Sequence, residues 1–128
     1  MFAAQNQRAN SNMIDLQTQD QLEALLRRGE YKNAQVAPLV AIYFTADWCG
    51  ACRRINLEQI LAEFPNFRWY LCDVDANNYS AGFCGVRAIP SFMLILNGTA
   101  SPLYTNSDAN SIIEWINMNL QSQSHLLH

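Results

Sequence analysis

Three largely apolar runs punctuate the chain, and each has the length of a buried strand. They begin at Pro38 (PLVAIYFT), at Phe67 (FRWYLCDVD) and at Ser91 (SFMLILNG). Their apolar positions are consecutive rather than alternating, which is typical of strands buried on both faces of a sheet. The pattern therefore predicts three central strands.

Two weaker signals predict strands at the edges of the sheet. Residues 13–16 could form a short first strand before the first helix. Asn97-Gly98, directly after the third apolar run, is a hairpin turn signal. We therefore expect PLYT, residues 102–105, to be the returning edge strand.

Apolar residues at helical spacing predict three helices, at residues 18–29, 53–64 and 107–120. The first helix opens with a capping box, in which the side chains of Thr18 and Gln21 each accept a hydrogen bond from the other residue's backbone N–H. The second follows closely on a cysteine pair, and Pro65 ends it.

A shorter segment at residues 76–85 predicts one more helical turn. The order is then strand, helix, strand, helix, strand, helix, strand, strand, helix (β-α-β-α-β-α-β-β-α). Alternating strands and helices favour parallel pairing, and the hairpin adds an antiparallel strand. We predict an α/β fold, with a central mixed β-sheet covered by helices on both faces. It forms a single domain at residues 13–120, between a flexible tail at 1–12 and a frayed tail at 121–128.

Composition narrows the class of protein. The chain has 128 residues, of which 50% are hydrophobic and 15% charged, so it can bury a proper core. A net charge of -3 provides no basic surface, so neither nucleic acid nor an acidic membrane is an expected partner. The apolar runs are too short to span a bilayer. No apolar segment of signal-peptide length opens the sequence, which predicts a cytoplasmic, reducing location.

The candidate chemistry lies in TADWCGACRR, which begins at Thr45. Cys49 falls where a strand gives way to a helix, and the free N–H groups there favour a thiolate and lower the pKa of Cys49. Cys52 lies one turn further on the same side, where its sulfur can resolve a mixed disulfide. Arg53 and Arg54 are nearby cations that we expect to be solvated, with a weak role.

Other interpretations of the cysteine pair fit less well. Half of a zinc site would need two further ligands, and Cys72, Cys84, His125 and His128 are poorly placed to provide them. A static structural disulfide does not suit a reducing compartment. Two inert cysteines would both have to lie at a helix start by chance. We expect a redox couple, with no metal and no cofactor.

Two anchors far apart in the sequence resemble the thioredoxin family. ADWCGAC is similar to its active-site run, and GVRAIPSFMLILNG is similar to the stretch that holds its cis-proline. The resemblance covers residues 13–120 and implies a thioredoxin fold. It implies that Cys49 is the nucleophile, that Cys52 is the resolving thiol, and that the Ile89-Pro90 bond is cis and faces both. It also implies a substrate groove formed by Trp48, Gly50, Ala51, Ile89, Pro90 and Ser91.

Three residues depart from the family pattern and are candidate modulators. Ala51 replaces a proline, which predicts a somewhat less reducing pair. Tyr43 stands where the family has a buried aspartate; a phenol, with an ordinary pKa near 10, is a poor base at neutral pH, and a core aromatic is the better explanation of the residue. Asn106 stands where a glycine is usual on the contact surface, which could narrow the choice of partners.

Cys84 lies six residues before Pro90, so the resemblance places it near the rim of the active site. There it would be a third reactive thiol, open to glutathionylation or to an intermolecular disulfide. The alternative is a small turn residue without function. We expect a monomer, with a Cys84-linked dimer as the variant form, and Cys72 as a buried hydrophobic residue.

The expected function is that of a thiol-disulfide oxidoreductase that reduces protein disulfides and serves cell redox homeostasis. The resemblance implies electrons from a thioredoxin reductase or a glutathione-type donor. A disulfide oxidase or isomerase of similar fold is an alternative that Ala51 favours. A different class also stays open, namely a non-catalytic binding module on a thioredoxin scaffold, because a fold does not fix a function.

Overall fold

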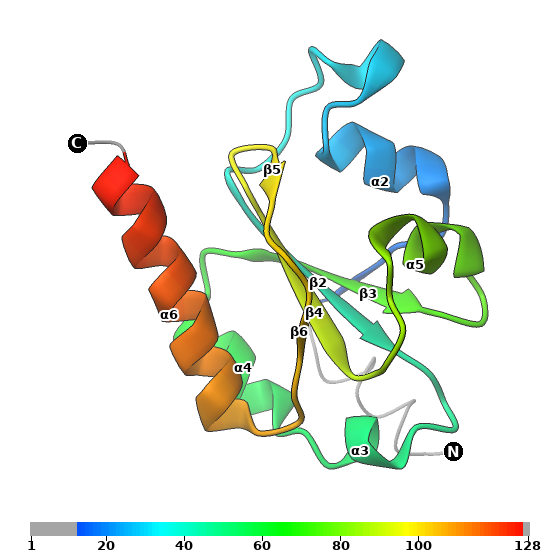
Figure 1. Ribbon diagram of the computed structural model, residues 1–128, viewed down its shortest axis with the longest axis vertical. Helices are drawn as coiled ribbons and strands as arrows, with labels where there is room; N and C mark the ends of the chain where they lie inside the picture. The colour runs from blue at the N-terminus through cyan, green and yellow to red at the C-terminus, as the bar shows by residue number, and fades with distance from the viewer. Residues whose placement is uncertain (1–12, 127–128) are drawn as a thin grey trace.

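The computed structural model describes residues 13–126, and the tail predicted at residues 1–12 lies outside that range. A mixed six-stranded sheet forms its centre, in the order β1-β3-β2-β4-β5, with β6 also paired to β4 (Figure 1). β1, β3 and β2 are parallel, whereas β4 is antiparallel to β2, β5 and β6. The strands are β1 (Ile14–Asp15), β2 (Leu39–Thr45), β3 (Arg68–Asp73), β4 (Ser91–Leu96), β5 (Thr99–Ala100) and β6 (Tyr104–Thr105).

The central strand, β2, is buried on both faces, as its continuous apolar run predicts. Val40, Ile42 and Phe44 point into one core cluster, and Ala41 and Tyr43 point into the other. All five side chains are fully inaccessible to solvent. Because successive side chains of a strand point to opposite faces, this strand separates two cores.

Helices cover both faces, which confirms the predicted layering. α4 and α6 pack on the face that holds Tyr43, and α2 and α5 pack on the other (Figure 1). α2 begins with the predicted capping box of Thr18 and Gln21. The helices are α2 (Gln19–Leu25), the 3-10 helix η1 (Gly29–Tyr31), α3 (Gly50–Arg53), α4 (Leu57–Glu63), α5 (Asn78–Cys84) and α6 (Ala109–Leu126). Among residues 13–126, no helix combines the length and the hydropathy that crossing a bilayer requires.

The segment after the cysteines differs from the single helix predicted at residues 53–64. The chain forms α3, turns, and starts again as α4. Ile55 is buried in the turn, and the side chain of Asn56 accepts a hydrogen bond from the backbone N–H of Gln59 as the N-cap of α4. Apolar spacing alone does not show this break, because Ile55 would be buried whether it lay in a turn or in a continuous helix.

The end of the chain also differs from the prediction. α6 continues to Leu126 and so includes the first six residues of the tail that was predicted to fray, residues 121–128. The segment QSQSHL contains neither Gly nor Pro, so nothing in it stops a helix that is already formed. Residues 127–128 lie outside the described range.

The predicted hairpin is confirmed, and its returning strand is divided in two. Asn97 and Gly98 have φ values of 53° and 85°, the left-handed pair that a tight hairpin turn requires. β5 and β6 each pair with β4, and Pro102 lies between them. Since proline has no N–H to donate, it interrupts the ladder there.

Candidate active site

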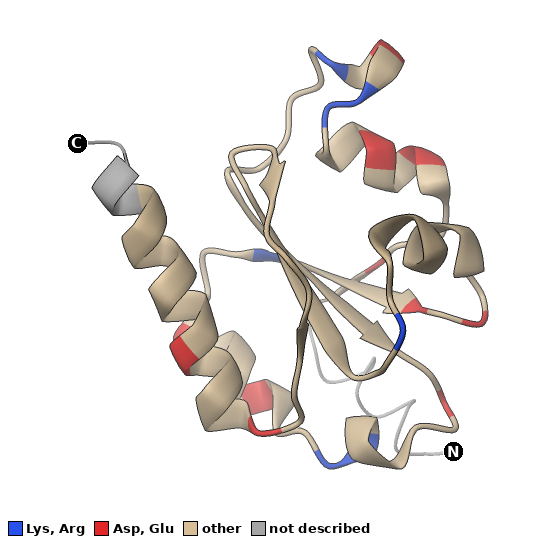
Figure 2. Ribbon diagram, viewed as in Figure 1, with Lys and Arg blue, Asp and Glu red and all other residues tan. Residues whose placement is uncertain are grey.

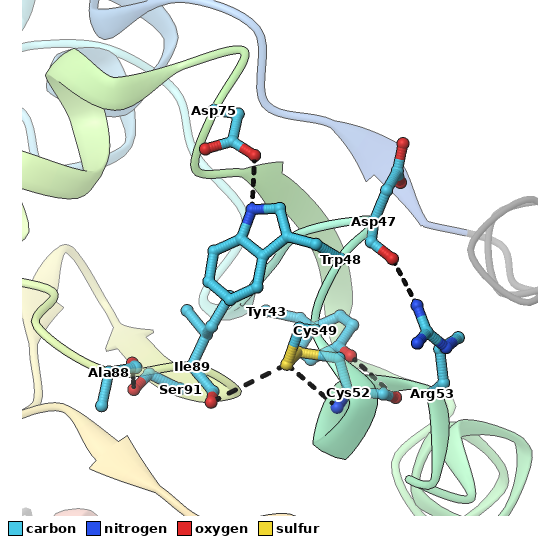
Figure 3. The surroundings of a disulfide bond; sticks show 10 residues. All are labelled: Tyr43, Asp47, Trp48, Cys49, Cys52, Arg53, Asp75, Ala88, Ile89 and Ser91. Atoms are coloured by element: carbon cyan, nitrogen blue, oxygen red, sulfur yellow. Dashed lines mark hydrogen bonds between the residues drawn. A yellow bond between two sulfur atoms is a disulfide. The ribbon is translucent and has the colours of Figure 1, made fainter.

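The two cysteines lie where β2 leads into α3, at the carboxyl end of the sheet's central strand (Figure 3). Cys49 is the N-cap of α3, and Cys52 belongs to the helix itself. Their sulfurs form a disulfide, with the two Cα atoms 5.3 Å apart. Cys49 is 5% exposed, whereas Cys52 is fully buried. The pair is therefore asymmetric, and Cys49 is the member that solvent can reach.

The backbone supplies the polar surroundings of the Cys49 sulfur. The Cys52 N–H donates to Cys49 Sγ at 3.1 Å. A hydrogen bond from a backbone N–H stabilises a thiolate more than a thiol. The carbonyl oxygen of Ile89 lies 3.8 Å from the same sulfur (Figure 3). The sulfur that can be reached is thus held between a backbone donor and a backbone acceptor.

The loop opposite the cysteines joins α5 to β4. Its Ile89-Pro90 peptide bond is cis, and Ile89 packs against both core clusters. The Ser91 hydroxyl lies 2.6 Å from the carbonyl oxygen of Ala88, to which it donates, and 2.6 Å from the hydroxyl of Thr105. Ser91 is 1% exposed, so its side chain holds the loop instead of lining a groove.

Trp48 forms the exposed rim of the site. Its side chain is 65% exposed, yet its position is fixed, because the indole Nε1–H donates to Asp75 Oδ2 at 2.8 Å (Figure 3). Asp75 follows β3, and its own N–H donates to Asp73 Oδ1 at 2.9 Å. Sequence reasoning missed Asp75. The signal available was an acidic residue just beyond a strand that lies parallel to β2.

Tyr43 lies beneath the resolving cysteine. It is fully buried in β2, with its ring stacked on Phe92 at 5.0 Å between centroids. Its hydroxyl donates to the carbonyl oxygen of Cys52 at 3.4 Å. The residue is therefore both a core aromatic and a polar contact to the first turn of α3.

The two arginines after Cys52 are both exposed to solvent, as we expected. The Arg53 guanidinium donates to the carbonyl oxygen of Asp47 (Figure 3). Arg54 Nη1 lies 3.6 Å from the position that a Cβ on Gly50 would occupy. Both side chains fold back toward the loop that carries Cys49, a placement that the sequence did not indicate.

Cys84 does not lie at the rim of the site. It is partly buried and packs against the core cluster on the other face of the sheet, which contains Cys72 and Met93. Burial raises the pKa of the Cys84 thiol to about 11 and that of Cys72 to about 12. The rim placement failed because α5, which ends at Cys84, packs on this face, and the five loop residues 85–89 separate Cys84 from Pro90. Neither thiol has the low-pKa character of a redox-active cysteine.

Asn106 does lie at the same end of the sheet as the cysteines. β6 pairs Thr105 with Ser91, so the residue after Thr105 reaches the level of the Pro90 loop. Asn106 Nδ2 donates to the Tyr104 hydroxyl at 3.1 Å, and its Oδ1 accepts from the Asp108 N–H at 2.8 Å. These bonds fix the turn that leads into α6.

Within the part of the chain that the structure describes, no group of three His, Cys, Asp or Glu side chains could hold a metal ion.

Comparison with known proteins agrees with this geometry. A family model described as thioredoxin matches residues 24–118. The chain belongs to the thioredoxin family. A thioredoxin from Geodia cydonium is 41% identical over 64 residues, covering 48% of this chain and 60% of the relative. Thioredoxin-3, mitochondrial, from Saccharomyces cerevisiae is 36% identical over 61 residues, covering 46% of this chain and 48% of the relative.

Solved structures of other thioredoxins have the same fold as this chain. The X-ray structure of Fasciola hepatica thioredoxin has a TM-score of 0.69 and is 30% identical, covering 83% of this chain and 98% of that one. The matched segment spans about half of the Saccharomyces cerevisiae relative and somewhat more of the Geodia cydonium relative. The thioredoxin fold and the family are thus established.

Proposed function

We propose that the chain is a thiol-disulfide oxidoreductase that reduces protein disulfides through Cys49 and Cys52. One observation carries the proposal: the two sulfurs are bonded across the first turn of α3, and the more exposed one accepts a backbone hydrogen bond. Membership of the thioredoxin family supports the same chemistry.

The reaction starts from the reduced pair and proceeds in two exchanges. The Cys49 thiolate attacks one sulfur of the substrate disulfide, whose S–S bond breaks, and the departing sulfur leaves as a thiolate that takes up a proton. Cys52, as a thiolate, then attacks the Cys49 sulfur of the mixed disulfide and displaces the second substrate sulfur, which is also protonated. Two electrons have passed to the substrate, and the pair is left as the disulfide seen in the structure.

The groups around the sulfurs suggest how a substrate is held. The Ile89 carbonyl lies beside Cys49, directly before Pro90. It can accept a hydrogen bond from a backbone N–H of an extended substrate. The exposed face of Trp48 offers apolar contact. Gly50 and Ala51, between the two cysteines, are partly exposed, so a substrate can contact them. We expect Asn106, which follows β6 at the same end of the sheet, to contact a partner.

In this scheme Tyr43 is a positioning residue for Cys52. Its hydroxyl donates to the Cys52 carbonyl, which supports the turn that orients Cys52 toward Cys49. A tyrosine hydroxyl is neutral at pH 7. We infer that the proton of Cys52 leaves to water or to the departing substrate sulfur.

The partners and the location belong to the same proposal. The reaction needs a reductant to restore the dithiol, for which a thioredoxin reductase or a glutathione-type donor has the right chemistry. Cys72 and Cys84 are both unpaired, which suits a reducing compartment such as the cytoplasm. A mitochondrial relative exists, so localisation of the tagged full-length protein would separate the two compartments. The partial burial of Cys84 disfavours an intermolecular disulfide and so favours a monomer.

Turnover with insulin and dithiothreitol tests the activity, with precipitation of the freed insulin B chain as the signal. We expect Cys49→Ser to abolish turnover. Cys52→Ser should retain the first exchange and accumulate a mixed disulfide that reducing electrophoresis releases. A wild-type protein that neither turns over insulin nor forms that adduct would contradict the proposal and leave a binding module.

The direction of the reaction follows from the reduction potential. It is measured by equilibrating a Cys84→Ser variant against a glutathione series. A value near that of thioredoxins, about -270 mV, is expected for a reductant, and one near about -180 mV, as in protein disulfide isomerase, would instead mean an oxidant or isomerase.

A further inference from the structure

Two guanidinium groups lie against the loop that carries the accessible sulfur. The Arg54 side chain lies beside Gly50, the residue directly after Cys49. Its Nη1 atom is 3.6 Å from the position that a Cβ on Gly50 would occupy. The Arg53 guanidinium is held on the Asp47 carbonyl, two residues before Cys49. The cationic ends of the two side chains therefore lie against the residues that flank Cys49, Arg54 beside Gly50 and Arg53 on Asp47, the latter shown in Figure 3.

Their charges are available to a ligand. Arg53 and Arg54 are both exposed. The Arg53 side chain donates to a neutral backbone carbonyl. Within residues 13–126, neither guanidinium forms an ion pair with a carboxylate. An arginine without a carboxylate partner presents its donors to whatever binds beside it.

The remaining charges of the rim are unevenly distributed. The Asp75 carboxylate is at the indole nitrogen of Trp48, and Asp47 is exposed beside it. Two of the basic residues, Arg53 and Arg54, lie at the end of α3 (Figure 2), and Arg87 is exposed on the loop that leads to Ile89. In a chain of net charge -3, the α3 side of the site is thus a local concentration of positive charge.

We propose that Arg54, supported by Arg53, determines substrate specificity by favouring protein disulfides with an acidic residue next to the attacked cysteine. The occupant is an extended segment of a partner protein, whose carboxylate lies over Gly50 while its sulfur meets Cys49. The inference rests on the proposed reductase activity and adds the substrate class. Charge complementarity is its physical basis.

The test uses two disulfide-cyclised peptides that differ only in Glu or Gln beside one cysteine. The rate constant for reaction of each with the prereduced protein is measured by chromatography of the quenched products. We expect the wild type to react about threefold faster with the Glu peptide at low ionic strength, the size of an exposed ion pair. The preference should fall toward unity at about 0.5 M salt, where surface charges are screened.

The variants isolate the guanidinium. Arg54→Gln should bring the Glu-to-Gln rate ratio close to one, and Arg54→Lys, which keeps the charge, should retain most of the preference. Arg68→Gln is the matched control: it makes the same change in net charge at the start of β3, which pairs with the start of β2 and so lies away from the site. It should leave the ratio unchanged. Comparing ratios removes any intrinsic effect of Glu on the peptide disulfide.

A wild-type ratio of one, or a preference that persists in Arg54→Gln, would overturn the inference. If neither peptide is reduced, the proposed activity fails, and the charge preference is then decided by calorimetric binding of the same peptides with serine in place of cysteine. Tighter binding of the Glu peptide that Arg54→Gln removes would sustain the specificity role without the chemistry, and equal binding would overturn it too.

Discussion

At the level of single residues, the four cysteines divide into two pairs of different chemistry. Cys49 and Cys52 share a disulfide at the start of α3, with a backbone N–H on the outer sulfur. Cys72 lies in the core on the opposite face and Cys84 packs against it, and burial raises the pKa of both thiols. The difference comes from position in the fold, since all four begin with the same side chain.

The raised pKa of Cys84, about 11, predicts its reactivity. In a Cys49→Ser/Cys52→Ser variant, we expect iodoacetamide to modify Cys84 at pH 7 about 100-fold more slowly than an ordinary cysteine, because the thiolate fraction falls tenfold per unit of pKa. The rate should rise with pH and level off only near pH 11. Mass spectrometry of the labelled site measures this, with urea-unfolded protein as the control. A midpoint near 9 in the folded protein would contradict the burial argument.

At the level of elements, the break between α3 and α4 is the feature that shapes the site. A single straight helix would carry Cys52 and Leu57 on one continuous axis. The turn at Ile55 instead ends α3 after four residues and starts α4 on a new cap, Asn56. The short α3 is thereby free to present Cys49 at its start, while α4 packs against α6.

The cap makes a stability prediction. Asn56→Ala removes the side-chain oxygen that accepts from the Gln59 N–H at 3.2 Å, which should lower the free energy of unfolding by about 1 kcal/mol. Asn56→Asp keeps an acceptor at the same place and should recover most of it. Chemical denaturation of the three proteins under oxidising conditions is the measurement. Equal losses in both variants would mean that the cap contributes nothing beyond packing.

At the level of the whole molecule, the fold brings together groups that are far apart in sequence. Ile89 is 40 residues from Cys49, and Asp75 is 27 residues from Trp48. They meet because β3 and β4 flank β2 on its two sides. The segment that follows β3 and the loop that precedes β4 therefore lie at the end of the sheet where β2 runs into α3.

The disulfide links only residues three apart, so its effect on global stability should be modest. The loop-entropy relation gives about 2 kcal/mol for a ring of this size. We expect the oxidised protein to be more stable than the reduced one by roughly that amount, measured by guanidinium unfolding with and without dithiothreitol. The Cys49→Ser/Cys52→Ser variant should show no dependence on dithiothreitol. An oxidised form less stable than the reduced form would contradict the relation.

Local signals were sufficient for much of the fold. The continuous apolar run of β2, the Thr18 capping box and the Asn97-Gly98 turn all depend on neighbouring residues, and the structure contains all three. The ends of elements were less predictable. The break at Ile55 and the extension of α6 to Leu126 depend on what each segment packs against, and apolar spacing does not record that.

The sequence by itself determined the order of elements, the α/β class and the cysteine pair, because these follow from short-range periodicity and from a spacing of one helical turn. Only the tertiary structure decided which groups surround that pair. It packed Cys84 against the opposite core, bound Trp48 to Asp75 and folded Arg54 back over Gly50. Contacts of this kind arise where the chain returns to the same end of the sheet or where a long side chain chooses one rotamer among many, and both are settled by packing in three dimensions.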